Sequence, residues 1–469
     1  MKNVDAVILG GGPVGCLMAV LLNDMGVSNV LVERDVSPYQ LPRAIVMDDE
    51  ILRAMHDHGM GPWFDAHTTK LERADFVSAD GNVIMGTDVP KMGLQGVAPV
   101  VTHFQPEMDT MLRAEAERRG TDARWGRTVI DMVDQGETVR TTLDDGDVIE
   151  SRWFVGCDGA SSWTRKKVGL PLEDLGFDQE WLVVDVDLLD GADPDLPRGV
   201  RQYCDPHRPS TYVKGHGRNR RWEFQVQEHE DSVHLNTEPE LWKLLAPWLT
   251  PADARIIRSA VYRFHAVVAP SMQSGNVFLA GDAGHQMPPF MGQGLNSGMR
   301  DAINLAWKMS FVTRGLAGRA LLDTYSTERV PHVRSIVAHA ADMGRLIDQL
   351  AGRVSHGVGE DSGYGGSRPQ PHLEAGVVVG DDPRVGHQFW YSPDVSRAVV
   401  ADGASFAIVC SSPVDVPESI RKWNPRVVVD ASAVGDAHAI IVRPDRFVAA
   451  VATDQRALES MATTLAAHG

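Results

Sequence analysis

The sequence predicts an α/β protein in which a Rossmann-like nucleotide-binding domain carries an inserted, mainly antiparallel β-sheet domain of α+β type. Three observations predict this fold. Residues 1–35 alternate between an apolar strand, a glycine loop, a helix and a second apolar strand, which is typical of a parallel sheet under helices. Residues 177–264 show short alternating stretches broken by proline and glycine, which favours an antiparallel sheet. Helical patterning returns after Gly294 and continues to about Leu350.

A chain of 469 residues is too long for one small core, so we expect several domains. The changes in pattern divide the chain into five segments. The nucleotide-binding domain has a first part (1–175, with a piece of the substrate domain around 71–100) and a second part with the following helices (265–350), and the substrate domain (176–264) lies between them. A Gly- and Ser-rich linker (351–372) then leads to a C-terminal domain (373–469). The last domain shows four strand-like runs and a final helix: Phe406–Cys410, Arg426–Asp430, Ala439–Arg443, Phe447–Ala452 and Asp454–His468.

Charge and cysteine content exclude several classes of protein. The chain has 45 basic and 63 acidic residues and a net charge of -18, so it lacks the basic surface that nucleic-acid binding requires. Its longest apolar runs, such as Val14–Leu22, are too short to span a bilayer, and we expect neither a membrane segment nor a signal peptide. The cysteines show no CxxC and no Cys/His ligand spacing, which predicts reduced thiols in a cytoplasmic protein and no metal site. They are Cys16, Cys157, Cys204 and Cys410.

The clearest local motif is a glycine loop between the first strand and the first helix. Gly10, Gly12 and Gly15 fit the GxGxxG pattern, which follows an apolar strand and opens a helix. Gly10 permits a tight turn, Gly12 lets the backbone approach a pyrophosphate, and Gly15 lets the helix pack closely on the sheet. The N-terminus of that helix offers free N–H groups and a positive dipole to phosphates.

An acidic residue completes this motif. Glu33 ends the second strand, 18 residues after Gly15, where a carboxylate can accept hydrogen bonds from a ribose diol. By itself Glu33 is better explained as a solvated charge at a strand end. The motif predicts dinucleotide binding but does not decide between NAD and FAD.

Two further segments share the strand-then-glycine pattern. Phe154–Gly159 is a strand that enters an Asp-Gly turn, and Val277–Asp282 is a strand that ends in Gly-Asp. An aspartate at the end of such a strand can bind a ribityl or ribose hydroxyl. The Gly-Gln-Gly-Leu-Asn run at 292–296 then opens a helix whose N–H groups can face a pyrophosphate or the pyrimidine edge of a flavin.

Together these motifs, GxGxxG with Glu33, the DG turn and GDAxH…P…GQGxN, resemble those of the group A flavoprotein aromatic hydroxylases over roughly the first 350 residues. Shorter motifs at 42–44, 48–50, 202–206 and 221–224 are similar to the 3-(3-hydroxyphenyl)propionate hydroxylase branch. Residues 439–445 resemble the thioredoxin-like tail of larger members, although Cys410 stands alone and leaves the tail without a redox pair. We therefore expect a structural or dimer-supporting thioredoxin-like domain.

The resemblance implies an FAD-dependent monooxygenase that uses O₂ and takes electrons from transiently bound NADH or NADPH. Such an enzyme hydroxylates a small phenolic ring through a flavin C4a-hydroperoxide. We favour NADH from the closer branch and leave a homodimer open. Three alternatives stay open: a tailoring monooxygenase that acts on a larger polyketide-like phenol, a flavin-dependent reductase that does not use O₂, and a non-catalytic FAD-binding protein.

The resemblance also assigns residues. It implies that Pro289 and Arg43 act at the reaction site, since the backbone of Pro289 would face the flavin ring and Arg43 would lie near the flavin pyrophosphate. Gly284 stands where alanine is usual in the family. The cofactor-binding residues that it implies are Gly10, Gly12, Gly15, Glu33, Arg43, Gln105, Arg113, Asp158, Asp282, Gly294, Leu295 and Asn296.

The candidates for substrate binding come from the middle domain, and the sequence does not identify a catalytic base. They are Tyr203, Tyr212, Glu223 and Gln225, which lie on strand-like stretches where a polar side chain could point inward. Structural roles compete with functional ones at other positions. His285 fits a buried hydrogen-bonded histidine, Arg165 fits a salt-bridged arginine, and the acidic run at 48–50 fits the N-terminus of a helix.

Overall fold

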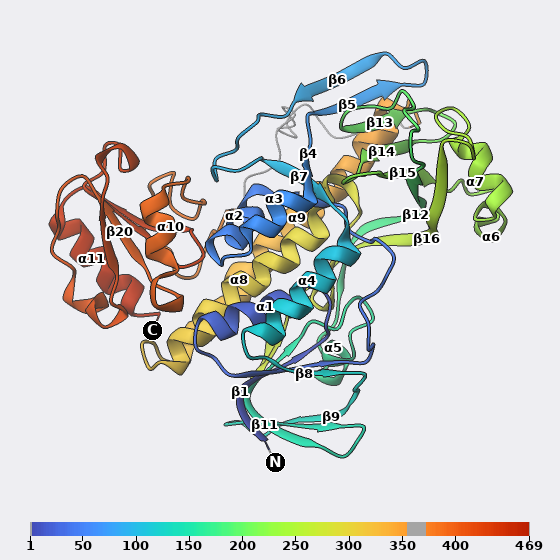
Figure 1. Cartoon of the computed structure of the whole chain (residues 1–469). Coiled ribbons are helices and arrows are strands. Elements are labelled where there is room, and N and C mark those ends of the chain that lie inside the picture. The colour runs from blue at the N-terminus through green and yellow to red at the C-terminus, as the bar shows by residue number, and fades with distance from the viewer. Residues whose placement is uncertain (1, 354–371, 469) are drawn as a thin grey trace.

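The structure is a computed structural model, and it describes residues 2–353 and 372–468. Nearly all of the predicted linker at 351–372 lies outside the described residues. Figure 1 shows two large sheets at opposite ends of one body, with long helices between them and a smaller domain at one side. The mixed α/β class predicted from the sequence is confirmed.

The first sheet has eight strands and forms the nucleotide-binding half. Its main path runs β17-β18-β11-β1-β2-β8, and β10 and β9 extend from β11. The pairs β18–β11, β11–β1, β1–β2 and β2–β8 are all parallel, as the alternating strand and helix pattern predicts. The strands are β1 (Lys2–Leu9), β2 (Asn29–Glu33), β8 (Asp122–Trp125), β9 (Val129–Asp134), β10 (Val139–Leu143), β11 (Val148–Gly156), β17 (Gln273–Ser274) and β18 (Val277–Leu279).

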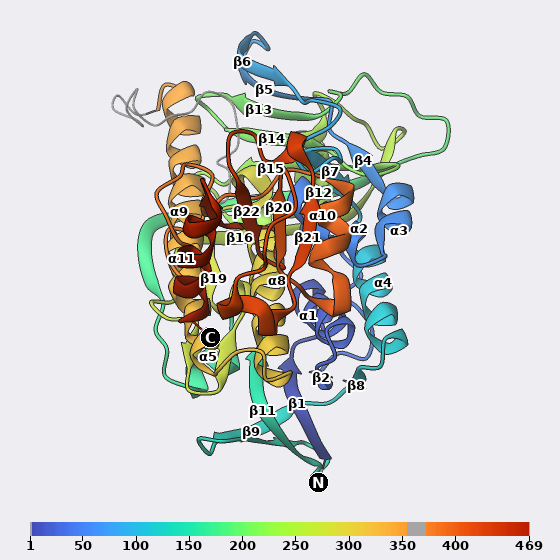
Figure 2. The ribbon, with the colours of Figure 1, turned by 90° about the vertical axis from the view of Figure 1, so that its left-hand side faces the viewer.

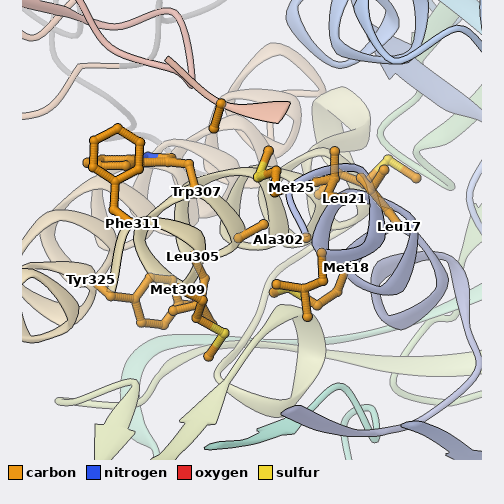
Figure 3. Close-up of a cluster of buried hydrophobic side chains, with 14 of the residues drawn as sticks. Leu17, Met18, Leu21, Met25, Ala302, Leu305, Trp307, Met309, Phe311 and Tyr325 are labelled. Carbon is orange, nitrogen blue, oxygen red and sulfur yellow. The ribbon is translucent and has the colours of Figure 1, made fainter. Parts of the chain in front are cut away.

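Four helices form the main core beside this sheet: α1 (Pro13–Asp24), α4 (Gln105–Arg118), α8 (Gln293–Thr313) and α9 (Ala320–Leu350). Helices α1 and α4 contact its strands, α8 packs on α1, and α9 packs on α8 and on the second sheet. In Figure 3, Leu17 and Leu21 of α1 lie beside Ala302 of α8, and Leu305 extends the same cluster. Full burial of one such aliphatic side chain contributes about 1.5–3 kcal/mol. The helical patterning expected from Gly294 to Leu350 is thus two helices, α8 and α9.

A small sheet and three short helices belong to the same half of the molecule. A three-stranded sheet contains β3 (Val46–Asp48), β7 (Val100–His103) and β4 (Thr68–Lys70), and α2 (Asp49–Asp57), α3 (Gly61–His67) and α5 (Trp163–Lys167) are short helices. A short loop and one 3₁₀ turn, Gly281–Ala283, follow β18, so the strand predicted to reach Asp282 ends at Leu279.

The second sheet also has eight strands, in the order β19-β16-β12-β15-β14-β13-β5-β6. It is antiparallel except for the β13–β5 pair, so strands from residues 73–88 join the sheet of the middle region. Helices α6 (Ser232–Leu235) and α7 (Glu238–Leu245) lie beside it. Its strands are β5 (Arg73–Ser78), β6 (Val83–Asp88), β12 (Glu173–Leu188), β13 (Val200–Cys204), β14 (Ser210–Lys214), β15 (Asn219–Gln225), β16 (Ala254–Val268) and β19 (His285–Gln286).

The C-terminal domain is a four-stranded mixed sheet in the order β21-β20-β22-β23. Each strand lies within a stretch predicted from the sequence: β20 (Ala407–Cys410), β21 (Arg426–Val429), β22 (Ala439–Val442) and β23 (Val448–Ala452). Helices α10 (Pro393–Val399) and α11 (Gln455–Ala466) pack on it. Figure 2 shows this domain in front of α1 and α8. Within the described ranges, every helix is too short or too polar to cross a membrane.

Candidate active site

The glycine loop after β1 is held by its own backbone. Gly10 has a φ of 111°, and a Cβ atom there would overlap the carbonyl oxygen of Cys157. A Cβ atom on Gly15 would overlap the carbonyl oxygen of Gly10. Gly12 differs, because a Cβ atom there would meet no other atom within 4 Å. Gly10 and Gly15 therefore serve protein packing, while Gly12 leaves open space at the N-terminus of α1 where a ligand phosphate can approach.

Two charged side chains brace this loop from the outside. Glu33 accepts hydrogen bonds from the N–H groups of Gly11 (2.6 Å) and Asp35 (2.8 Å), so it is not simply a solvated charge. Arg113 is buried and donates to the carbonyl oxygen of Gly11 (3.2 Å), while its guanidinium lies 4.3 Å from the ring centre of Trp125. The structure therefore shows Arg113 fixing the loop by carbonyl contacts, whereas the family resemblance places it close to FAD.

A second loop reaches the same region from the start of β3. Arg43 is exposed, and its guanidinium stacks on Tyr39 at 4.4 Å. Gln105 accepts hydrogen bonds from the N–H groups of Arg43 (3.2 Å) and Ala44 (2.6 Å), which fixes the backbone and leaves the guanidinium free to meet an anion. Arg221 of β15 donates to the carbonyl oxygen of Arg43 (2.6 Å), so the second sheet also holds this loop.

The Asp-Gly turn after β11 has a structural use for its carboxylate. Asp158 accepts hydrogen bonds from the Ser162 hydroxyl (2.6 Å) and the Thr164 N–H (2.8 Å) at the start of α5. Arg165 donates to the carbonyl oxygen of Ala283 (2.9 Å), and burial lowers its pKa. The salt bridge considered for Arg165 is therefore replaced by a carbonyl contact, which ties this turn to the loop after β18.

That loop presents Asp282 to solvent. The Asp282 side chain is exposed, yet the surrounding protein raises its pKa by desolvation, and Arg43 and His285 partly oppose this shift. Asp282 is therefore accessible to a ligand and lies near Arg43. His285 is fully buried and its Nε2 lies 2.7 Å from the Asp301 carboxylate, so it is a structural histidine that anchors the loop.

The start of α8 follows this loop in the chain. Met291 and Gly292 both have left-handed φ values (67° and 65°), which turn the chain sharply before the helix begins. A Cβ atom on Gly294 would meet open space, and Pro289 and Leu295 are partly exposed next to it. The N-terminus of α8 is therefore accessible to a ligand.

The side chain of Asn296 is committed to the protein. It is buried and donates to the carbonyl oxygen of Gly292 (2.7 Å), while its Oδ1 accepts from the N–H of Asp48 (3.0 Å). Any contact between Asn296 and a ligand would involve its backbone. The acidic run at 48–50 lies at the start of α2 as predicted, but Asp48 and Glu50 also pair with the buried Arg300 of α8.

The four substrate candidates lie on two different faces of the second sheet. Tyr203 accepts a hydrogen bond from Trp248 (3.0 Å), and the Tyr212 ring packs on Trp222 at 4.9 Å, on the face that contacts α7. Glu223 and Gln225 point to the opposite face, on the side of Arg221 and Arg43. Of the four side chains that the sequence allowed to point inward, the two tyrosines lie on the other face, because alternation turns them away from that side.

Glu223 is the inward carboxylate without a hydrogen-bonding partner among the described residues. Its side chain is buried, its closest cation is Nη1 of Arg221 at 4.0 Å, and burial raises its pKa to about 7. Thr211 lies opposite Glu223 in the sheet and donates to Gln202 (2.6 Å), so a polar row faces the nucleotide-binding half. Gln225 is occupied differently, because it accepts a hydrogen bond from Arg353.

Sequence reasoning missed the buried charges that support the site. Arg221 is bound by Asp185 on β12 (2.8 Å), and Arg329 pairs with Asp301 beneath the loop after β18. Arg300 pairs with Asp48 and Glu50. A partial signal was present in the sequence, because Arg300 and Asp301 stand between apolar residues, Met299 and Ala302, but it does not identify their partners. Charged residues in such a position are buried only when they are paired.

Three comparisons with known proteins bear on this geometry. The model of the FAD binding domain family matches residues 3–340. A probable NADH-specific resorcinol 4-hydroxylase of Rhodococcus jostii is 37% identical over 352 residues, which cover 74% of this chain and 66% of that protein. The 3-(3-hydroxyphenyl)propionate/3-hydroxycinnamic acid hydroxylase of Escherichia coli K12 is 30% identical over 518 aligned positions, 97% of this chain and 92% of that protein.

Solved structures share the whole fold at low sequence identity. The flavin-dependent monooxygenase PieE, in complex with FAD and substrate, aligns with a TM-score of 0.81 at 21% identity over 99% of both chains. Aklavinone-11 hydroxylase, with FAD and aklavinone, aligns with a TM-score of 0.80 at 20% identity over 100% of this chain and 99% of that one.

Proposed function

This chain belongs to the FAD binding domain family, and from that premise we propose that it hydroxylates a small neutral or carboxylate-bearing phenol. It is an FAD-dependent aromatic-ring monooxygenase that takes electrons from NAD(P)H. The two curated relatives are named for phenols with a single aromatic ring, which supports a small substrate over a polyketide-like one. The observation that carries the proposal is the open phosphate cradle at Gly12, together with the buried carboxylate of Glu223 on the face of the second sheet that points toward Arg43.

The accessible residues of this region fit FAD. The open space at Gly12 and the N-terminus of α1 suit the pyrophosphate, and the exposed guanidinium of Arg43 supplies a countercharge. The exposed Asp282 suits a ribityl hydroxyl, and the accessible N-terminus of α8 at Gly294 suits the edge of the ring system. Glu33 would hold the adenosine ribose from the position where it already braces the glycine loop.

When bound and reduced, FAD activates O₂ and supplies the electrophilic oxygen. The protein holds the phenol in reach of that oxygen, excludes water and increases the electron density of the ring. For the last task we propose Glu223. Its carboxylate has no competing donor among the described residues, and a pKa of about 7 suits a group that accepts the phenolic proton near neutral pH.

Several finer assignments also belong to this proposal. NADH is favoured as the donor, because one curated relative is named as NADH-specific and the other belongs to the branch that the sequence resembles. The uptake of O₂, a cytoplasmic location and a homodimer are proposed from the sequence and the four free cysteines. Light scattering on the purified protein tests the dimer.

The test of the function is a coupled measurement on the FAD-loaded protein. Oxidation of NADH and of NADPH and uptake of O₂ would be followed with resorcinol, 3-(3-hydroxyphenyl)propionate, hydroxybenzoates and unsubstituted phenol, with mass spectrometry of the products. We expect one phenol to stimulate NADH oxidation and to gain one oxygen atom for each O₂ consumed. A protein that binds FAD but whose NADH oxidation responds to no phenol would contradict the proposal.

A further inference from the structure

A buried carboxylate lies beneath the loop that presents Asp282. Asp301 of α8 is fully buried, and so are its partners His285 and Arg329. Three donors converge on it: Arg329 Nε at Oδ1 (2.7 Å), and His285 Nε2 (2.7 Å) and the Gly281 N–H (2.9 Å) at Oδ2. These bonds and the cation lower its pKa against the effect of burial, so Asp301 is ionised.

The geometry of these bonds matters for the loop. Gly281 and His285 stand directly on either side of Asp282, Ala283 and Gly284, and both bind the same oxygen of Asp301. One carboxylate atom therefore fixes both ends of the segment that carries Asp282. Asp282 itself is exposed and has no part in this set of bonds.

Arg329 connects this set to the C-terminal domain through its neighbour on α9. Glu328 is buried and accepts hydrogen bonds from Arg443 Nη2 (2.7 Å), from Lys308 Nζ (2.7 Å) and from the N–H of Val377 (2.8 Å). Arg443 and Val377 belong to the C-terminal domain. The domain thus holds α9 at the residue directly before Arg329.

A second contact of the C-terminal domain lies away from this path. Arg446 is also buried and pairs with Asp57 at the end of α2, at 3.2 Å. It touches neither Glu328 nor Arg329 in the described contacts. Arg443 and Arg446 of the same domain therefore allow a matched comparison. Each forms a buried ion pair, but only Arg443 contacts the residue that precedes Arg329.

We propose that Asp301 and His285 are positioning residues for the FAD-binding loop, and that the C-terminal domain maintains their arrangement through Arg443, Glu328 and Arg329. This inference rests on the proposed function, because it assumes that Asp282 meets the cofactor. It assigns a role to a domain that carries a single buried cysteine and hence no dithiol pair among the described residues. Loop geometry, and with it the affinity for FAD, is what the domain controls.

The first test removes the negative charge and one acceptor oxygen of Asp301 while nearly keeping the size of its side chain. In Asp301→Asn the loop loses its ionised acceptor, and we expect the Kd for FAD, from fluorescence titration of the apoprotein, to rise at least tenfold. His285→Leu should show a similar loss, whereas His285→Gln, which keeps a donor, should stay within about threefold of the wild type. The absorption bands of the bound flavin should shift in Asp301→Asn, and also in the double variant with His285→Leu. The proposal would be overturned if the Kd and the flavin spectrum were unchanged in both Asp301→Asn and His285→Leu.

The second test addresses the C-terminal domain. Arg443→Lys and Glu328→Gln should weaken FAD binding at least fivefold. Arg446→Lys should lower the unfolding temperature of the apoprotein as much as Arg443→Lys does, but it should leave the Kd for FAD unchanged. If all three variants weaken FAD binding in proportion to their loss of stability, the domain has only a general structural role and the proposal fails. A wild-type protein that binds no FAD would instead contradict the proposed function.

Discussion

The two loops proposed to bind FAD are held in place by different means. The glycine loop after β1 depends on the absence of side chains, since a Cβ atom on Gly10 or Gly15 would overlap backbone atoms. The loop after β18 depends on buried charges, because Asp301 fixes it from below and Arg300 holds the start of α8 against Asp48 and Glu50. The first solution is local in sequence, and the second joins segments up to 252 residues apart.

This difference has a consequence for tolerance to mutation. Backbone packing around Gly15 cannot relax without moving a strand and a helix together. A charge network is also sensitive, because removal of one partner leaves another charge buried without compensation. Each loop therefore has positions where a small change has a large effect, but the chemical nature of the damaging change differs.

The largest effect is expected at the glycine that packs helix on strand. In Gly15→Ala the added methyl group would overlap the Gly10 carbonyl oxygen, so α1 must separate from β1. We expect loss of FAD binding together with a misfolded or insoluble protein, measured by soluble yield and by circular dichroism. Soluble Gly15→Ala protein with normal FAD content would contradict the steric argument.

The next effect concerns the charge network. Arg300→Met removes the cation between Asp48 and Glu50, both less than 10% exposed, and should lower the free energy of unfolding by about 3–5 kcal/mol. Urea unfolding measures it. Arg263→Met is the control, because its ion pair with Asp178 is exposed and should contribute less than about 1 kcal/mol. An equal loss of unfolding free energy in the two variants would show that the buried ion pair contributes no more to stability than the exposed one.

The next prediction concerns Glu223, the carboxylate of the second sheet that points toward Arg43. Glu223→Gln should lower kcat about 100-fold, which corresponds to about 2.7 kcal/mol. The pKa of Glu223 is raised to about 7, so a base there is active above that pH and kcat of the wild type should rise as pH passes through 7. The variant should lose this rise. Gln225→Ala is the control, and an unchanged pH profile in Glu223→Gln would exclude Glu223 as the base.

The same variant should also change stability in a pH-dependent way. A carboxyl group with a raised pKa in the folded state destabilises the fold once the unfolded chain ionises, so the wild type loses stability between about pH 4.5 and pH 7. Glu223→Gln should therefore raise the Tm at pH 8 and leave it nearly unchanged at pH 4. An equal shift at both pH values would point to a change in packing instead.

The smallest effect is expected at the glycine that faces open space. In Gly12→Ala the methyl group meets no other protein atom within 4 Å, so folding should be unaffected. The methyl group would occupy the space proposed for the pyrophosphate, and we expect about a tenfold increase in the Kd for FAD, or about 1.4 kcal/mol. Isothermal titration measures it. If Gly12→Ala instead destabilises the apoprotein, the distinction between Gly12 and Gly15 is wrong.

The same contrast explains how far sequence reasoning reached. The glycine loop, Glu33 and Asp282 follow strand ends within a few residues, and local rules of backbone geometry identify them. Asp301 and Arg329 could not be identified in this way, since helical residues are ordinary until the fold brings their partners to them. The family resemblance supplied FAD and the reaction class, which comparison with known proteins then confirmed.

The second sheet was harder to predict for a different reason. One face contacts α7 and the other faces the nucleotide-binding half, so both are buried and the polar alternation that marks a solvent-exposed face is lost. Tyr203 and Tyr212 could therefore not be separated from Glu223 by pattern alone. The register of β13, β14 and β15 shows that the two tyrosines and Glu223 lie on opposite faces of the sheet.

The contact between Glu328 and Arg443 also has a consequence for how the protein is made. A ribosome delivers the chain from its N-terminus, so Lys308 and Glu328 emerge more than a hundred residues before Arg443. Until those last residues appear, α9 lacks the partner that completes its burial. Loading of the flavin is thus expected to follow the emergence of residue 443, and a nascent chain stalled before that residue should remain colourless.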